Sequence, residues 1–386
     1  MSELDGIFLA RPETPPAGIP LAVKDLFDTA GLVTTYGSIL FVDHVPERTA
    51  AAVRRLQAGG YGVVGKTNLH EFAYGVTSEN PHFGTVPNPL APGRSAGGSS
   101  GGSAAALAAG LAEAALGTDT GGSIRIPAAW CGVVGFKPTF GLVPLEGCFP
   151  LAPSFDHAGP MARTVEECAW MLELVAPQSH VALSTTMRMR SELRGGGRDE
   201  LRVAVAWLDD AEPLVRARVE AVAARLPRAE RLDFPRPKGI DRLFMHEVAG
   251  VHRGLFSEHA DSYGEDVREK LVECMAVTDG EAEAAASERE RYRERCLELL
   301  DGFDLLLTPT QAKVAPPVGA VGNERRGEIT RFTFPFNALG WPALALPCGP
   351  AEEGLPASVQ LVARAGEDAL VLAVGASLLR GTPGLS

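Results

Sequence analysis

Residues 93–110 read GRSAGGSSGGSAAALAAG, and a second glycine- and serine-rich stretch, GTDTGGSIRIPA, follows at residues 117–128. A flexible linker of this composition stays mobile because it has no apolar residues to bury. Here both stretches continue directly into apolar residues. We therefore expect two loops held between packed elements, and the question is whether they bind phosphate or carry a reactive serine.

A phosphate-binding loop has formal support, because GYGVVGKT at residues 60–67 satisfies the pattern G-x-x-x-x-G-K-[ST]. That motif needs a strand before it and a helix after it, so that the helix N-terminus faces the phosphates. In this sequence a predicted helix at about 49–58 precedes the pattern, and VVGKTN is itself strand-like. Lys66 would then lie at a strand end, which leaves nucleotide binding as the weaker alternative.

The composition is that of an ordinary globular protein, with 386 residues, 45% hydrophobic and 22% charged. A formal charge of −12 argues against a general nucleic-acid binder, which needs a basic face. The longest apolar segment, residues 104–116, contains Glu113 and is too short to span a membrane. The six scattered cysteines predict reduced thiols, and the absence of a basic-then-apolar leader predicts a cytoplasmic protein.

Helical and strand-like segments alternate over the first 175 residues, which predicts an α/β fold. We expect a single large mixed, mostly parallel β-sheet covered by helices on both faces. A helix of small residues is predicted at 103–116, and a polar helical stretch lies between about 210 and 300. Strand patterns return in DLLLTPT, PALALPCG and ASVQLVAR before a final apolar helix at 367–379.

A serine hydroxyl is a poor nucleophile unless a neighbouring base takes its proton. None of the eight histidines lies within a Gly/Ser loop, whereas Lys24 interrupts the apolar strand IPLAVKDLF. Burial disfavours a charged ammonium and lowers its pKa, so a buried lysine can serve as a base. The alternative, a strand-end lysine that reaches water, is about equally compatible with Lys24 taken alone.

These features together resemble the amidase signature hydrolases. GIPLAVKD is similar to the lysine strand of that family, and GGSSGGSAAALAAG with GTDTGGSIRIPAAWCGVVGFKPT matches its two-part signature. VVGKTNLHEFAYG, DHAGPMART, LLLTPT and PFNALGWPALALPCG agree as well. The resemblance is strong over residues 18–176 and moderate over 303–380.

The resemblance implies catalysis by Lys24, Ser99 and Ser123. Ser123 would attack the amide carbonyl, and Ser99, which in the family usually follows a cis peptide bond, would bridge Ser123 to a neutral Lys24. An acyl-enzyme on Ser123 would then be hydrolysed by water. The resemblance implies neither a cofactor nor a metal.

The glycines of the second stretch allow the backbone to approach a substrate closely. We expect an oxyanion hole formed by the backbone N–H groups of Thr120, Gly121, Gly122 and Ser123. We expect four further residues to support the site, namely Gly98, Ser100, Asp119 and Arg125. Arg331 is the candidate for recognising a substrate carboxylate, with a solvated surface arginine as the alternative.

The resemblance implies one amidase domain over residues 1–386. Its parts would be a signature core at 18–176, a variable and largely helical insertion at 177–302, and a C-terminal part at 303–386 that completes the sheet. Lys24 follows barely twenty residues, whereas family members commonly have several helices ahead of it.

By this resemblance the chain is an amidase that converts a small carboxylic amide to a carboxylate and ammonia or an amine. Ile126 stands where members of a tRNA-dependent amidotransferase commonly have glutamine, which favours a stand-alone amidase. We expect a small-molecule amide substrate, no nucleic acid, no membrane, and a monomer or homodimer. The alternatives are the glutamine-hydrolysing A subunit of such an amidotransferase and a hydrolase of allophanate or another urea-type amide.

Overall fold

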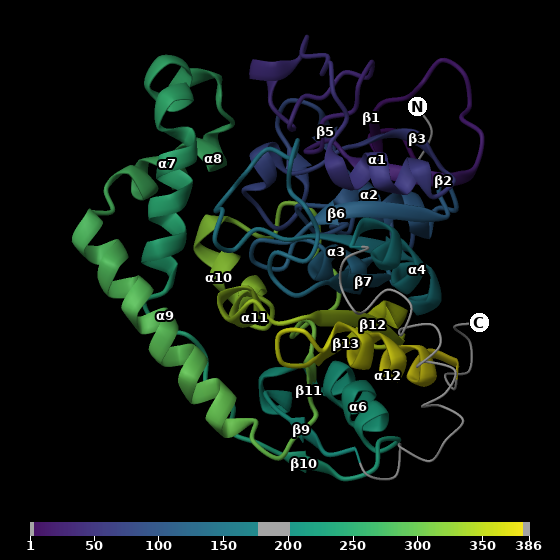
Figure 1. Ribbon diagram of the computed structural model, residues 1–386, viewed down its shortest axis with the longest axis vertical. Coiled ribbons are helices and arrows are strands. Elements are labelled where there is room, and N and C mark those ends of the chain that lie inside the picture. Colours follow the sequence, from purple (N-terminus) through teal and green to yellow (C-terminus); the bar gives the residue numbers. More distant parts are fainter. Residues whose placement is uncertain (1–3, 177–200, 381–386) are drawn as a thin grey trace.

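One large β-sheet runs through the computed structural model, which describes residues 4–176 and 201–380 (Figure 1). In the described part of the chain this sheet has 11 strands. In their order across the sheet they are β1 (Phe8–Ala10), β3 (Tyr61–Thr67), β2 (Ile19–Lys24), β6 (Ala114–Thr118), β8 (Ala158–Ala162), β7 (Val134–Lys137), β12 (Ala343–Pro350), β13 (Pro356–Val362), β11 (Leu305–Pro309), β9 (Val203–Val205) and β10 (Ala229–Arg231).

The sheet is mixed, as the alternating pattern predicts. Parallel pairing joins β3 to β2 and β2 to β6, and again joins β11 to β9 and β9 to β10. The remaining six neighbouring pairs are antiparallel, against four that are parallel. Among the five central strands β6, β8, β7, β12 and β13, every pair of neighbours is therefore antiparallel.

Helices cover both faces of the sheet, which confirms the predicted layering. One face packs against α1 (Ala51–Ala58), α4 (Val165–Val175), α6 (Pro213–Ala223) and α12 (Asp368–Arg380). The other face packs against α2 (Gly101–Ala108) and α3 (Arg125–Trp130). Side chains alternate between the faces of a strand, so in β2 Leu21 and Val23 join the first core and Ala22 joins the second.

The helix predicted at 103–116 is wrong in its second half. α2 ends at Ala108, and Gly110, with φ of 69°, turns the chain into β6. Alanine favours helices, but a fully buried strand between two neighbours also accepts small residues. The long alanine run therefore hides a helix, a glycine turn and a strand.

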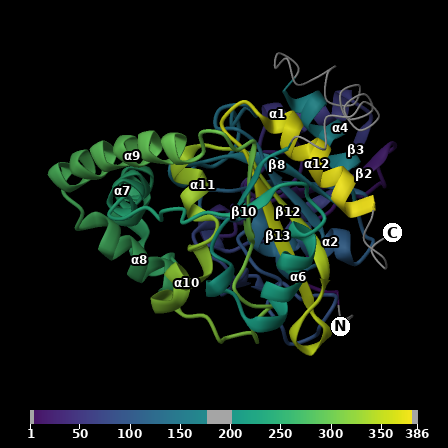
Figure 2. The same ribbon diagram turned by 90° about the horizontal axis from the view of Figure 1, so that it is seen from below.

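A group of three helices lies to one side of the sheet, seen at the left in Figures 1 and 2. They are α7 (Asp241–His259), α8 (Glu265–Met275) and α9 (Asp279–Leu299), and α9 also packs against α11 (Phe334–Leu339). They belong to the stretch predicted as a helical insertion, whose residues 177–200 lie outside the described residues. Within the described ranges, every helix is too short or too polar to cross a lipid bilayer.

Candidate active site

Lys24 lies at the end of β2 and is completely buried. Its Nζ is 2.7 Å from the Ser99 hydroxyl oxygen and 2.7 Å from that of Thr118. Burial lowers the pKa of this lysine to about 7, although Cys148, Asp119 and Asp156 act in the opposite direction. A substantial fraction of Lys24 is therefore an uncharged amine at neutral pH, which is the form that accepts a proton.

The geometry of the strand explains why Lys24 points at Ser99. Residues 22 and 24 share one face of β2, and Ala22 packs in the core beneath α2. Ser99 comes just before α2, whose first residue is Gly101. The strand and the start of this helix therefore bring Lys24 and Ser99 together although 75 residues separate them.

A cis peptide bond joins Gly98 to Ser99, as the resemblance implied. A Cβ atom at Gly98 would lie 2.7 Å from the backbone nitrogen of Ser78, so only glycine fits there. The carbonyl oxygen of Ser99 accepts a hydrogen bond from the Ser78 hydroxyl at 3.2 Å. Ser100, the next residue, bonds both backbone groups of Thr118 through its hydroxyl.

Ser123 lies in the loop between β6 and α3 and lines a cavity together with Thr120 and Gly121. Its carbonyl oxygen accepts a hydrogen bond from the Ser100 N–H at 3.1 Å, which ties the two serine loops together. Between the described side chains of Ser99 and Ser123, however, no hydrogen bond is formed. The structure therefore contains the Lys24–Ser99 contact of the predicted relay. For the Ser99–Ser123 contact it shows that the two loops are adjacent.

The backbone N–H groups of Thr120, Gly121, Gly122 and Ser123 donate to no acceptor among the described residues, although nearly all buried amides in proteins are bonded. Two side chains hold this loop from outside. The Thr333 hydroxyl donates to the Gly121 carbonyl at 2.6 Å, and the Thr120 hydroxyl donates to Asp156 at 2.7 Å. Free N–H groups on a fixed loop are what an oxyanion hole requires.

Asp119 and Arg125 form a buried ion pair at 2.8 Å beneath the loop that carries Ser123. Burial by itself would raise the pKa of Asp119, but the charge and hydrogen bonds of Arg125 hold it well below its usual value. Asp119 also accepts the Ile124 N–H at 3.2 Å. The ion pair therefore fixes the turn that carries Ser123 and does not face the cavity.

Several residues that hold the site were not predicted from the sequence. Asn337 on α11 donates to the Asp119 side chain at 2.8 Å and accepts from Arg125 at 2.7 Å, and Gln360 on β13 accepts from Arg125 at 2.7 Å. Asn337 lies in the motif PFNALG, which by itself indicates no role for this amide. Thr118 lies inside the second signature stretch and Asp156 opens the motif DHAGPMART, but neither residue was predicted to have a role in the site.

Lys66, the lysine of the phosphate-loop pattern, lies inside β3 and is fully buried. Its Nζ contacts Asp25 at 2.9 Å and the Thr34 hydroxyl at 2.6 Å. A lysine held in this way inside a strand cannot cradle phosphates at a helix N-terminus. The alternative of a nucleotide-binding loop therefore lacks its structural context.

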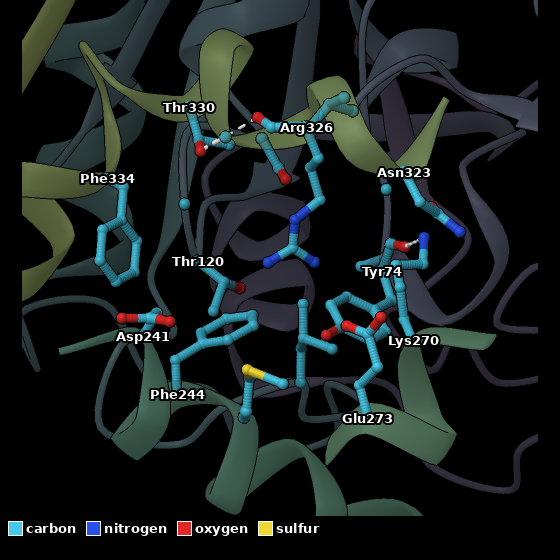
Figure 3. A pocket seen from close by; sticks show the side chains of 18 of the residues that line it. Tyr74, Thr120, Asp241, Phe244, Lys270, Glu273, Asn323, Arg326, Thr330 and Phe334 are labelled. Atoms are coloured by element: carbon cyan, nitrogen blue, oxygen red, sulfur yellow. Dashed lines mark hydrogen bonds between the residues drawn. The ribbon is translucent and has the colours of Figure 1, made fainter. Parts of the chain in front are cut away.

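The cavity in front of Ser123 has a volume of about 680 Å³. Figure 3 shows its walls, to which Tyr74, α7, α8 and the segment 323–334 contribute. Arg331 is not among its lining residues, because its guanidinium donates to the Asp210 carbonyl at 2.6 Å and lies over the Phe332 ring. The cavity instead receives Arg326 from the neighbouring helix α10 (Arg326–Thr330).

The sequence model of the family described as Amidase matches residues 2–372. The A subunit of glutamyl-tRNA(Gln) amidotransferase from Haloarcula marismortui is 35% identical over 94% of this chain and 95% of its own length. The AtzE subunit of 1-carboxybiuret hydrolase from Pseudomonas sp. strain ADP is 36% identical over 94% of this chain and 83% of its own length. A solved structure described as an amidase has a TM-score of 0.83 and 39% identity, covering 93% of this chain and 83% of its own.

These relatives correct the expected partners. A monomer or homodimer acting on a small-molecule amide without nucleic acid was expected, yet both sequence relatives are named as subunits and one name includes a tRNA. The expectation rested partly on Ile126, which is completely buried beside Trp130 and does not line the cavity. A side chain that does not face the substrate cannot select it. The expectation of no nucleic acid also rested on the net charge of −12, which is a property of the whole chain and does not describe the charge of any one part of its surface.

Proposed function

Because the chain belongs to the Amidase family, we propose that it hydrolyses an amide C–N bond through an acyl-enzyme on Ser123. The observation that carries this proposal is the 2.7 Å contact between Lys24 Nζ and Ser99 Oγ in a fully buried setting. A lysine whose pKa is lowered to about 7 by burial is matched to proton transfer at neutral pH. The serine loops then place a second hydroxyl, that of Ser123, at the cavity.

In the first step the Ser123 oxygen attacks the amide carbonyl carbon. The Ser123 proton passes to Ser99, and the Ser99 proton passes to the neutral amine of Lys24. The carbonyl oxygen becomes an oxyanion, which the free N–H groups of residues 120–123 stabilise. One such donor typically contributes about 3–4 kcal/mol to transition-state stabilisation.

The same groups act in reverse when the C–N bond breaks. Lys24 returns its proton through Ser99 to the leaving nitrogen, which departs as ammonia or an amine and leaves an ester on Ser123. Water then attacks the ester carbonyl and gives a proton to the relay. The carboxylate product leaves, and the Ser123 hydroxyl is restored.

The relatives' names support a role as the hydrolytic component of a larger enzyme. The match to the A subunit of glutamyl-tRNA(Gln) amidotransferase extends over nearly the whole of both chains. In that role the chain would release ammonia from an amide donor for a reaction on a partner subunit. The likeness to the AtzE subunit of 1-carboxybiuret hydrolase supports a second candidate, hydrolysis of a urea-type amide, again within a larger assembly.

A fluorophosphonate probe with peptide mapping tests the nucleophile. We expect labelling at Ser123, loss of labelling in Ser123→Ala, and full labelling in Ser103→Ala. Ser103 is a matched control because it is a buried serine of the same signature whose hydroxyl contacts Thr67 at 2.9 Å. Labelling at any other serine would overturn the assignment.

A further inference from the structure

We propose that a small cavity lined by Thr118, Cys148 and Asp156 binds water, and that this water exchanges a proton with Lys24 through the Thr118 hydroxyl. The inference rests on the proposed function, because it concerns the base of the same relay. Lys24 must be neutral to accept a proton. During turnover, however, the substrate occupies the cavity in front of Ser123, so a route to solvent on that side is covered.

The small cavity has a volume of about 160 Å³. Thr118 and Asp156 are buried parts of its wall, whereas Pro150 and Pro153 are exposed parts. The cavity therefore leads from the protein surface inward as far as Thr118. One molecule of liquid water takes up about 30 Å³, so the small cavity has room for several.

The small cavity and the cavity in front of Ser123 meet at Thr120, which lines both. Figure 3 shows the Thr120 side chain in the wall of the larger cavity. Among the described residues that form this wall, neither Lys24 nor Thr118 is present. A substrate in the larger cavity therefore covers Ser123 and leaves the approach to Thr118 through the small cavity open.

The Thr118 hydroxyl connects Lys24 to the small cavity. Its oxygen is 2.7 Å from the Lys24 nitrogen. A protonated lysine has three N–H donors and no lone pair, so the Thr118 oxygen accepts from it and the hydroxyl hydrogen needs another acceptor. No described residue supplies one, although Thr118 is only 3% exposed and buried polar groups are nearly always hydrogen-bonded. Water in the small cavity is the acceptor that this arrangement requires.

Two titratable groups, Asp156 and Cys148, also line the small cavity. Asp156 accepts hydrogen bonds from the Thr120 hydroxyl at 2.7 Å and from the Leu151 N–H at 2.9 Å. Burial raises the pKa of Asp156, whereas these hydrogen bonds favour its carboxylate form. A carboxylate here attracts the proton that leaves Lys24, and the Cys148 thiol offers water a weak further partner.

The proton transfer balances at each atom. Protonated Lys24 gives a proton to the Thr118 oxygen, and Thr118 gives its own hydroxyl hydrogen to a water molecule, which becomes hydronium. Lys24 is left as a neutral amine, and rotation of the Thr118 hydroxyl restores the starting arrangement. The reverse sequence protonates Lys24 again. The base can therefore reach its neutral form while the larger cavity is filled.

The test measures how fast the Nζ hydrogens of Lys24 exchange with water. The chain has six lysines, so nitrogen-15 labelling of lysine gives few side-chain NMR signals. The measurement is made at about pH 6, where Lys24 is mostly protonated because its pKa is about 7. Lys66 is the internal reference, since it is also completely buried and lines neither cavity. We expect Lys24 to exchange about tenfold or more faster than Lys66, whose exchange needs local opening of the fold.

Two variants separate the two hydroxyls that contact Lys24. Thr118→Val removes the hydroxyl that leads to the small cavity, and Ser99→Ala removes the one that leads toward Ser123. We expect Thr118→Val to slow the exchange of Lys24 about tenfold or more, and Ser99→Ala to leave it within about twofold, because the open route remains.

A third variant fills the small cavity and leaves both hydroxyls in place. Leu145 lines this cavity, and Leu145→Trp is expected to slow the exchange of Lys24 as Thr118→Val does. Leu297→Trp is the matched control, because Leu297 is exposed and lines neither cavity. Thermal unfolding of each variant checks that it is folded.

Exchange of Lys24 that is as slow as that of Lys66 would overturn the water site. So would wild-type exchange in folded Thr118→Val and Leu145→Trp, or slow exchange in Ser99→Ala alone, which would mean that the proton leaves toward Ser123. These failures are separate from failure of the proposed function, because the exchange rates do not depend on turnover. Amide hydrolysis that survives in Ser123→Ala would refute the nucleophile whatever the exchange of Lys24.

Discussion

The amine nitrogen of Lys24 lies 2.7 Å from the hydroxyl oxygen of Thr118. A neutral amine has two N–H donors and one lone pair. If one N–H donates to Thr118, the lone pair is free to face Ser99, whose hydroxyl oxygen is also 2.7 Å from the Lys24 nitrogen. We therefore predict that Thr118 positions Lys24, the proposed base.

Replacing Thr118 by valine keeps the shape and removes the hydroxyl. We expect kcat to fall about tenfold, the equivalent of one hydrogen bond, with KM nearly unchanged because Thr118 does not line the cavity in front of Ser123. Thr118→Ser should restore kcat. A rise in KM alone, or failure of serine to restore the rate, would contradict the positioning role.

The pH dependence of hydrolysis follows from the state of Lys24. Its pKa is lowered to about 7, and only the neutral form accepts a proton. We therefore expect kcat/KM to rise with pH through about 7 and to level off above it, without a limb near 10.4, where an ordinary lysine titrates. A rate profile measured from pH 5 to 9.5 with a neutral amide checks this.

Lys24 should also reduce the stability of the fold. Between pH 7 and about 10.5 the unfolded chain binds a proton on Lys24 that the folded chain lacks, so the free energy of unfolding rises with pH in this window. The loss of folding stability is greatest below pH 7, where lowering the pKa from 10.5 to about 7 corresponds to about 5 kcal/mol. Lys24→Met removes it.

We therefore expect the stability advantage of Lys24→Met over wild type to shrink by about 3 kcal/mol between pH 7 and 9.5. Urea unfolding at the two pH values measures this change, and it does not depend on the fixed loss of the two hydrogen bonds. Lys238→Met is the control, because Lys238 is exposed. If the difference in unfolding free energy between Lys24→Met and wild type does not vary with pH, the pKa of Lys24 is not lowered in the folded chain.

Gly122 and Gly121 provide a matched pair of test positions in the loop that we propose to form the oxyanion hole. Gly122 has φ of 135°, and a Cβ there would lie 2.2 Å from the Thr333 hydroxyl oxygen. At Gly121 the nearest atom to an added Cβ is a Phe334 ring carbon at 3.7 Å, an ordinary contact. We expect Gly122→Ala to lower kcat about 100-fold or more and Gly121→Ala to keep most of the activity, as measured by steady-state kinetics. Equal effects would show that the loop does not depend on the conformation of Gly122.

The sequence was sufficient to predict the elements with a clear period. The helix α1, the strand β3 and the C-terminal strands were recovered because apolar spacing reports the side that faces the core. The prediction of one helix over residues 103–116 was wrong, because a run of alanines shows neither a helical nor a strand periodicity. The contact between Lys24 and Ser99 could be expected only through the resemblance, since 75 residues separate them.

The residues that support the site were harder to predict because their roles depend on long-range contacts. Asn337 and Gln360 matter through Arg125, more than 200 residues earlier in the sequence. Arg326 and Arg331 both lie in the polar stretch NERRGEITRF, and nothing in their neighbours along the chain distinguishes the two. Only the direction of α10 decides that one reaches Asp210 and the other the cavity.

The contacts of Arg125 have a consequence for synthesis on the ribosome. All three residues of the proposed relay have been translated once Ser123 is added, but Asn337 and Gln360 are made more than 200 residues later. Until those amides emerge from the exit tunnel, the guanidinium lacks the partners that orient it toward Asp119. The nascent chain therefore contains Lys24, Ser99 and Ser123 long before it contains the two amides that complete the hydrogen bonds of Arg125.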